Sequence, residues 1–307
     1  MRSSGYLSNR KKSDTIFGGS VSDRVTYRSF TDFDIAAAHA LTVELKWPHR
    51  AEDWQFVAQA GRGFVAVEAG EVVGTALYWT FGDDRASLGM VIVSSARQGL
   101  GIGRKLMESV LEALDGRVVF LHATPTGQPL YEKLGFRPAG TLDQHQGTAL
   151  QPPLTALPRG ERLRPLGAMD SQRLIELASR ASGLERSGVL PALLAKADGI
   201  GLDRDGELIG FSLCRRFGCG FAIGPVVTPA SGGTTRAKAL ISHWLAMNVG
   251  AFVRIDTPGD SGLTGWLAGL GLPRLDTLAR MVLNGDAAQL EPDAEWRAFG
   301  IINHAML

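Results

Sequence analysis

Three glycines at alternate positions, Gly99, Gly101 and Gly103, lie between a β-branched run (91–93) and a stretch with helical spacing of apolar residues (104–114). Glycine has no Cβ atom, so a ligand can approach its backbone closely and the chain can take positive φ angles. The first N–H groups of the following helix have no partners within the helix and favour an anion such as phosphate. The spacing therefore predicts a strand, a phosphate-binding loop and a helix.

Other glycine loops fit this stretch less well. A dinucleotide fingerprint needs an acidic residue about twenty residues on and an early place in the chain. This loop instead follows several predicted strands, and it lacks the Lys-Ser/Thr pair of a phosphate loop. Its spacing, Gln98-x-x-Gly101-x-Gly103, resembles the acyl-CoA pyrophosphate loop of the GCN5-related N-acetyltransferase (GNAT) superfamily. A second stretch, Leu130-Tyr131-Glu132-Lys133-Leu134-Gly135-Phe136-Arg137-Pro138, is similar to that superfamily's late F-Y-x-K-x-G-F helix and turn.

The resemblance implies an α/β (α+β) fold, in which a mixed, mostly antiparallel sheet is flanked by helices. The local pattern agrees with this order of elements. Helices are expected on either side of Pro48, which should break any helix that reaches it. Strand patterns occur at 25–28, 63–68, 72–79, 87–93 and 118–121.

The chain then repeats. Matching residues recur 136 positions later, as in Arg28 and Arg164, and in Asp34 and Asp170. A single period of this length indicates a duplicated domain rather than a solenoid. We therefore predict two tandem acyl-CoA N-acyltransferase folds, with these bounds: a mobile tail at 1–23, an N-terminal domain at 24–145, a Pro- and Gly-rich linker at 146–160, and a C-terminal domain at 161–307.

The second copy has lost the two motifs. The stretch 231–236 replaces the glycine loop, and Leu267 replaces Tyr131. The chain thus resembles tandem proteins that join an active N-terminal domain to a degenerate C-terminal one. We expect the second half to shape the acceptor pocket or to fix the placement of the halves.

The resemblance implies that acetyl-CoA is the co-substrate and that residues of the first half contact it. The pantetheine arm would pair with the strand backbone, where one N–H would face the acetyl oxygen. Thr124 stands where the family commonly has an Asn that contacts CoA. The strand residues are Val91, Ile92 and Val93, and the pyrophosphate residues are Gln98, Gly99, Leu100, Gly101, Ile102, Gly103 and Arg104.

Two residues are candidates for proton transfer. Tyr131 holds the position that in many family members protonates or orders the CoA sulfur; the alternative is an aromatic packing residue. His122, after the strand 118–121, has an imidazole suited to act as a base, although a structural or solvated histidine is the alternative. Gly89 stands where family members often carry a Glu base, so the base must come from elsewhere, or a water chain must remove the proton.

The acceptor site is expected in the loop between the first helices. Trp47 and His49 lie where this fold usually lines that site, and Glu44 is a weaker candidate because a charge there also fits a solvated helix face. In the second half, Arg254, Asp256 and Asp260 are polar enough to read a substrate's charge. A solvated loop is the preferred interpretation for these three.

Composition excludes several function classes. A net charge of +1 gives no basic field for nucleic acid or an anionic membrane. No apolar run is long enough to span a bilayer, and no signal peptide is recognised, so a cytoplasmic protein is expected. Cys214 and Cys219 are predicted to be two buried thiols rather than a disulfide, and they are too few for zinc; no metal is predicted.

The sequence therefore predicts an acetyl-CoA-dependent N-acetyltransferase that acts on the primary amine of a small molecule by direct transfer in a ternary complex. It would act as a monomer or homodimer. One alternative within the enzyme class is a protein or peptide lysine acetyltransferase. Another alternative is a regulator that binds acetyl-CoA without turnover, which the missing strand Glu and Asn favour and the retained Tyr131 opposes.

Overall fold

The computed structural model describes residues 25–286 and 292–307, so the predicted tail at 1–23 lies outside the described residues. The first half contains strands β1 (Val25–Ser29), β2 (Arg62–Glu68), β3 (Glu71–Phe81), β4 (Arg85–Val93), β5 (Val118–Ala123) and β6 (Arg137–Thr148), and helices α1 (Ile35–Glu44), α2 (Ala51–Ala60), α3 (Ile102–Leu114) and α4 (Gln128–Lys133). The second half contains strands β7 (Glu161–Pro165), β8 (Asp198–Arg204), β9 (Glu207–Phe217), β10 (Gly220–Pro229), β11 (Phe252–Pro258), β12 (Arg274–Leu283) and β13 (Trp296–Gly300), and helices α5 (Ser171–Ser182), α6 (Leu190–Leu194), α7 (Thr235–Met247) and α8 (Thr264–Gly269).

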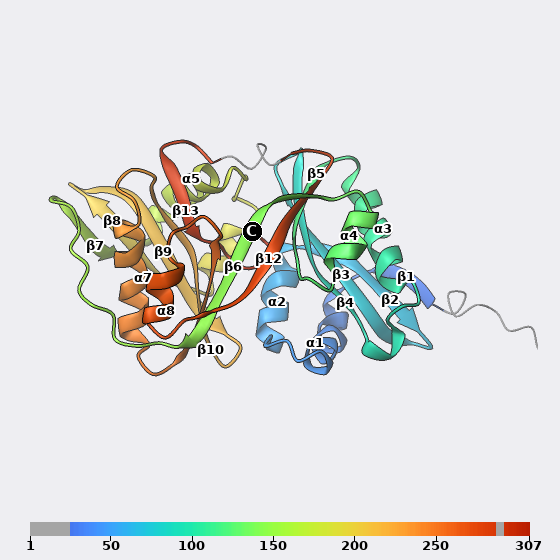
Figure 1. The fold of residues 1–307 in the computed structure, drawn as a ribbon. Helices are drawn as coiled ribbons and strands as arrows, with labels where there is room; N and C mark the ends of the chain where they lie inside the picture. The colour runs from blue at the N-terminus through green and yellow to red at the C-terminus, as the bar shows by residue number, and fades with distance from the viewer. Residues whose placement is uncertain (1–24, 287–291) are drawn as a thin grey trace, which may run out of the picture.

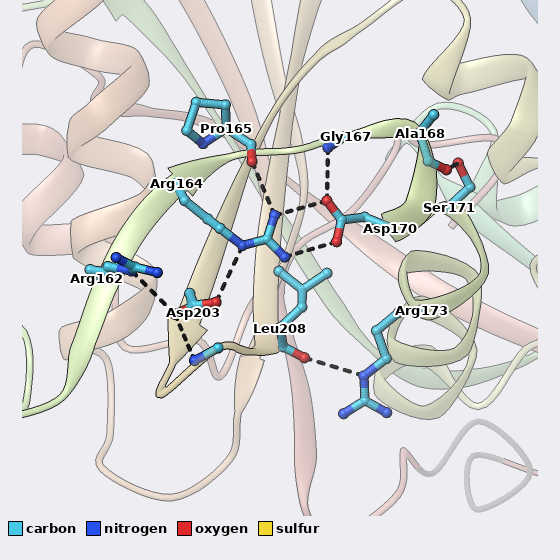
Figure 2. A network of polar contacts seen from close by, with 11 residues as sticks. Arg162, Arg164, Pro165, Gly167, Ala168, Asp170, Ser171, Arg173, Asp203 and Leu208 are labelled. Carbon is cyan, nitrogen blue, oxygen red and sulfur yellow. Dashed lines mark hydrogen bonds and ion pairs between the residues drawn. The ribbon is translucent and has the colours of Figure 1, made fainter.

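Apart from β13, which the first half lacks, the two halves repeat the same order of helices and strands, and this confirms the predicted duplication. The same ion pair even recurs where each first strand meets its helix. Arg28 and Asp34 are joined by two hydrogen bonds of 2.8 and 2.7 Å, and Arg164 and Asp170 by two of 2.8 Å. Figure 2 shows the second pair, in which Arg164 also reaches Asp203.

All the strands of the described residues belong to one mixed sheet, in the order β1-β2-β3-β4-β5-β12-β6-β11-β10-β9-β8-β7, with β13 on β10. The order shows that the halves exchange strands: β12 of the second half pairs with β5, and β6 of the first half pairs with β11. Strands β6 and β12 run side by side through the centre of the molecule (Figure 1). Strand β6 continues to Thr148, so residues 146–148 of the predicted linker are strand.

Strands β4 and β5 diverge in the first half. They are parallel neighbours at residues 85–87 and 118–120 only. A bulge in β4 places Met90 at φ 52°, and the Thr75 hydroxyl donates to the Met90 carbonyl at 2.8 Å. Because a bulge bends its strand, β4 leaves β5 here, and no described strand covers its free edge.

The corresponding gap in the second half is filled. Strands β10 and β11 also pair in parallel over three residues, 221–223 with 253–255. Beyond that point β13 pairs with β10 along 226–229. Thus β13 covers in the second half a strand edge that no described strand covers in the first.

Helical spacing of apolar residues builds the core on the faces of this sheet. In α3 the buried residues are Ile102, Leu106, Met107, Val110 and Leu114, which form one stripe along the helix.

Cys214 is buried in β9, but Cys219 is exposed in the turn that follows, so the prediction of two buried thiols is wrong for Cys219; neither forms a disulfide. Among the described residues, no helix has both the length and the apolar character to cross a membrane.

Candidate active site

The glycine loop ends at the first turn of α3. Gly99 and Gly101 have φ angles of 78° and 81°, a region that favours glycine, although a Cβ atom at either position would meet nothing within 4 Å. Gly101 is the N-cap of α3, no side chain caps the helix, and the first helical bond runs from the Lys105 N–H to the Gly101 carbonyl. The N–H groups of residues 102–104 therefore point out of the helix without intrahelical partners.

Two side chains fix the approach to this loop. Gln98 Nε2 donates to the Val93 carbonyl at 3.1 Å, which ties the loop to the end of β4. The Glu44 carboxylate accepts from the Ser95 N–H at 2.7 Å and from the hydroxyls of Ser94 and Ser95, and these bonds lower the pKa of Glu44. Glu44 does not line the cavity described next, so its position supports the loop rather than an acceptor.

A cavity of about 340 Å³ lies where β4 leaves β5, between the two halves. Among the predicted site residues, it brings together Trp47, His49, Val91, His122, Thr124 and Tyr131. Ile92 is buried in the core, and Val93 and the residues of the loop lie outside the cavity wall. The loop nevertheless stays close to this strand end, because a Cβ atom on Gly103 would be 3.5 Å from Val93 Cγ2.

Tyr131 comes from α4, and its side chain is largely buried. Thr124 sets the start of this helix, since its hydroxyl accepts from the Gly127 N–H at 3.2 Å. In the described part of the chain, the Tyr131 hydroxyl has no hydrogen-bond partner, and burial raises its pKa to about 12. The residue therefore presents a protonated hydroxyl to the cavity.

His122 contacts the end of the chain. Its Nδ1 lies 2.8 Å from the His304 carbonyl, which can only accept, so Nδ1 carries the proton. Burial lowers the pKa of His122 to about 3. At neutral pH the imidazole is uncharged and a weak proton acceptor, and its observed contact positions the C-terminal segment.

Residues 301–307 form part of the cavity wall, which no local pattern in the sequence predicted. The Ala305 carbonyl accepts from the Ser87 hydroxyl at 2.7 Å, and the Met306 carbonyl accepts from Arg186 Nη1 at 2.7 Å. A Cβ atom on Gly89 would lie 2.6 Å from the Ala305 Cβ. The position at which family members often carry a Glu is thus covered by this segment and has no room for a side chain.

His49 is enclosed by aromatic rings. Its ring centroid lies 5.8 Å from that of Trp47 and 5.2 Å from that of Phe217 in the second half. Burial, followed by the charge of Arg254, lowers its pKa to about 3. Its Nδ1 is buried and has no hydrogen-bond partner among residues 25–286 and 292–307.

The second half supplies charged groups to the same wall. Arg254 and Asp256 lie in β11 and are buried, joined at 3.0 Å between Nε and Oδ1, so the solvated-loop interpretation is wrong for both. Burial opposes ionisation of Asp256, but Arg254 and His304 outweigh it and lower its pKa. Asp260 is exposed and pairs with Arg297, as a solvated residue would.

Arg215 of β9 was not singled out from the sequence. Its guanidinium carbon lies 5.2 Å from the ring centroids of both Phe56 and Phe217, and its Nη1 is 3.3 Å from Asp53 Oδ1 in α2. This pair joins the halves across the cavity. The signal in the sequence was weak, because Arg215-Arg216 at the end of a strand also fits a solvated hairpin.

The loop of the second half is closed by its own side chain. Arg236 is the second residue of α7, as Gly103 is of α3. Its Nε and Nη2 each donate a hydrogen bond to Glu161 at 2.8 Å, and a Cβ atom on Gly232 would lie 2.6 Å from Arg236 Nη1.

No cluster of three or more His, Cys, Asp or Glu able to hold a metal occurs within the described ranges.

Comparison with known proteins agrees with this architecture. The profile of the Acetyltransferase (GNAT) family matches residues 29–136, and that of an Acetyltransferase (GNAT) domain matches residues 174–294. The "Uncharacterized N-acetyltransferase YitH" of Bacillus subtilis (strain 168) is 30% identical over 220 residues, which cover 70% of this chain and 75% of that protein.

Solved structures share the fold. A putative acetyltransferase from Pyrococcus horikoshii superposes with a TM-score of 0.74 at 19% identity, covering 97% of this chain and 100% of the other. A tandem GNAT protein from the clavulanic acid biosynthesis pathway gives a TM-score of 0.60 at 15% identity, covering 85% and 99%. The chain therefore belongs to the GNAT family, as an N-acetyltransferase with two GNAT domains in tandem.

Proposed function

We propose that this chain transfers the acetyl group of acetyl-CoA to the primary amine of a small molecule, in the cavity between its halves. The observation that carries the proposal is the open edge of β4. It leads from the uncapped N-terminus of α3 to the cavity that Tyr131 lines, whereas in the second half β13 and Arg236 fill the equivalent spaces.

In this proposal the backbone N–H groups of residues 98–104 hold the pyrophosphate of the co-substrate. The free edge of β4 at Val91–Val93 pairs with the pantetheine arm, and Thr124 lies beside it. A strand N–H would stabilise the developing charge on the acetyl oxygen. Two features support the fit of the co-substrate to these residues. No described strand pairs with this edge of β4, and Gly99 and Gly101, with positive φ angles, leave the approach to the loop open.

Tyr131 donates the proton that the departing sulfur needs. A thiol has a lower pKa than a phenol, so this transfer has to be concerted with departure of the sulfur. Water in the cavity, rather than His122, takes the proton from the amine, because a base with a pKa of about 3 is too weak at neutral pH. Direct transfer is supported because neither cysteine lines the cavity.

The size of the cavity supports a small acceptor. A volume of about 340 Å³ is near the lower end of the range for small-molecule pockets. Both halves enclose it, which disfavours the lysine of a folded protein. A net charge of +1 supports a function that requires neither nucleic acid nor an anionic membrane. We propose that the chain acts as a cytoplasmic monomer or homodimer.

The test is acceptor-dependent release of CoA, followed with a thiol reagent. Amino acids, polyamines, aminoglycosides and lysine peptides would be offered with acetyl-CoA to wild type, Tyr131→Phe and Gly101→Asp. Release that depends on a small amine and is lost in Gly101→Asp supports the proposal. Binding of acetyl-CoA with no release for any amine would instead support the non-catalytic regulator.

A further inference from the structure

We propose that the acceptor carries a carboxylate group as well as its amine, and that Arg215 and Arg254 bind this carboxylate. The inference rests on the proposed function and deepens it by naming a substrate class. Both arginines belong to the second half, so this would give the degenerate domain a direct part in recognition.

The first observation is an unsatisfied donor on Arg215. Its side chain is 6% exposed, and its Nε is buried with no hydrogen-bond partner among the residues that the structure describes. Its one carboxylate contact, to Asp53, is long at 3.3 Å, and Asp53 also accepts from Arg50 and from the Gly218 N–H. A buried N–H without an acceptor is costly, so this donor favours an acceptor atom from a ligand in the cavity.

The second observation is that three polar groups surround one ring. Phe217 contacts His49 at 5.2 Å between ring centroids, and its centroid lies 5.2 and 5.4 Å from the guanidinium carbons of Arg215 and Arg254. The Nδ1 of His49 is the other buried polar atom of this wall without a partner in the described ranges. The two unsatisfied atoms therefore belong to residues that line the cavity and contact the same ring, so one polar group of a ligand could serve both.

The third observation is the charge on this side. Asp53 is shared by Arg50 and Arg215, while Asp256 pairs with Arg254. The cavity wall itself carries two guanidinium groups, Arg215 and Arg254, and two carboxylates, whereas Arg50 lies outside the wall. Because Asp53 is divided between Arg50 and Arg215, the five groups together leave one positive charge, which matches a monoanion such as a carboxylate better than a phosphate dianion. A planar carboxylate also suits the forked guanidinium.

Elsewhere the wall carries Lys46, which is exposed, and Asp276 of β12. Asp276 forms no ion pair with any other described residue; its carboxylate accepts from the Thr277 N–H at 2.8 Å. It is therefore free to attract an ammonium group. A zwitterionic acceptor, with a carboxylate at Arg215 and an amine toward the thioester, fits this separation of charges.

The test measures binding of reaction products, so that it does not depend on turnover. N-acetyl-L-amino acids and their carboxamides would be titrated by calorimetry into the full chain saturated with CoA. At least one acid should bind, with its amide weaker by about tenfold or more. Arg215→Gln should weaken the acid by about tenfold or more and change binding of the amide less than about twofold, with CoA affinity unchanged.

Arg216→Gln is the matched control, because Arg216 is the exposed neighbour on the same strand and does not line the cavity; it should bind as wild type does. If Arg215→Gln fails to fold, Arg254→Gln takes its place. The inference would be overturned if wild type bound acids and amides equally, if Arg215→Gln weakened the binding of both equally, or if no acid bound. Turnover of polyamines or aminoglycosides alone would also overturn it while leaving the proposed transferase intact.

Discussion

Burial determines what the individual side chains of the cavity can do. It keeps the Tyr131 hydroxyl protonated, with a pKa of about 12, and keeps His49 and His122 uncharged at neutral pH, with pKa values of about 3. The same burial that keeps Tyr131 protonated therefore makes His122 a poor base. In the proposed mechanism, the tyrosine is the side chain on which proton transfer to the sulfur depends.

Tyr131→Phe should lower kcat by about 100-fold, because it removes the proton donor without changing the ring that packs against Phe136. The KM for acetyl-CoA should stay within about twofold. Initial rates against both substrates measure the two effects separately. Tyr78→Phe, which removes a hydroxyl outside the cavity, serves as the control. An unchanged kcat in Tyr131→Phe would reject this role.

The two glycine loops offer a matched pair. Gly101 and Gly233 have φ angles of 81° and 66°, and a Cβ atom at either would meet nothing within 4 Å, so alanine brings a similar strain of about 1 kcal/mol to both. Gly101→Ala should raise the KM for acetyl-CoA at least about fivefold, because it shifts the N–H groups of the loop. Gly233→Ala should leave it unchanged. Equal effects would contradict a binding role for the first loop alone.

At the scale of elements, the strand, loop and helix around Gly101 were predictable because local spacing specifies them. The position of β11 was not, because this strand is buried between β10 of its own half and β6 of the other half, and local spacing specifies neither pairing. Arg254 and Asp256 were consequently predicted to be solvated. The docking of 301–307 is equally non-local, since its contacts are with Ser87, His122 and Arg186.

The repeated Arg–Asp pair should stabilise each first strand and helix against acid. Hydrogen bonds from Arg164 lower the pKa of Asp170 to about 2 from an ordinary 3.8. A carboxyl group whose pKa is lower in the folded state stabilises the fold at pH values above its unfolded pKa. This stabilisation is lost as the pH falls from about 4 to 2. Asp170→Asn should therefore lower the free energy of unfolding by about 1 to 2 kcal/mol at pH 7, with a smaller difference from wild type at pH 3.

Urea denaturation at the two pH values measures this difference. Arg162→Gln is the control, since its side chain is 71% exposed and its bond to Asp203 is long at 3.3 Å; about 0.5 kcal/mol or less is expected. A loss in Asp170→Asn that is the same at both pH values would show that the ionised carboxylate is not responsible.

At the scale of the whole molecule, the repeat predicted two halves but not their exchange of strands. The sequence repeat identifies equivalent strands and does not specify which copy pairs with which. Because β6 and β12 are both flanked by strands of opposite halves, residues 24–145 should not fold alone. Expressed separately, this fragment should be insoluble or lack cooperative unfolding, whereas co-expression with 146–307 should yield a complex that co-purifies.

A soluble 24–145 fragment with a cooperative thermal transition would contradict this prediction.

The exchange of strands between the halves also has a functional consequence, because it brings Arg215 and Arg254 of the second half to the cavity that Tyr131 lines. The division of labour follows: the first half would bind acetyl-CoA, and the second would complete the acceptor site.

The most direct test of this division is the number of acetyl-CoA molecules that one chain binds, measured by calorimetric titration of the full-length protein. The account predicts one, because β13 and Arg236 fill the equivalent spaces of the second half. A stoichiometry of two per chain would contradict it.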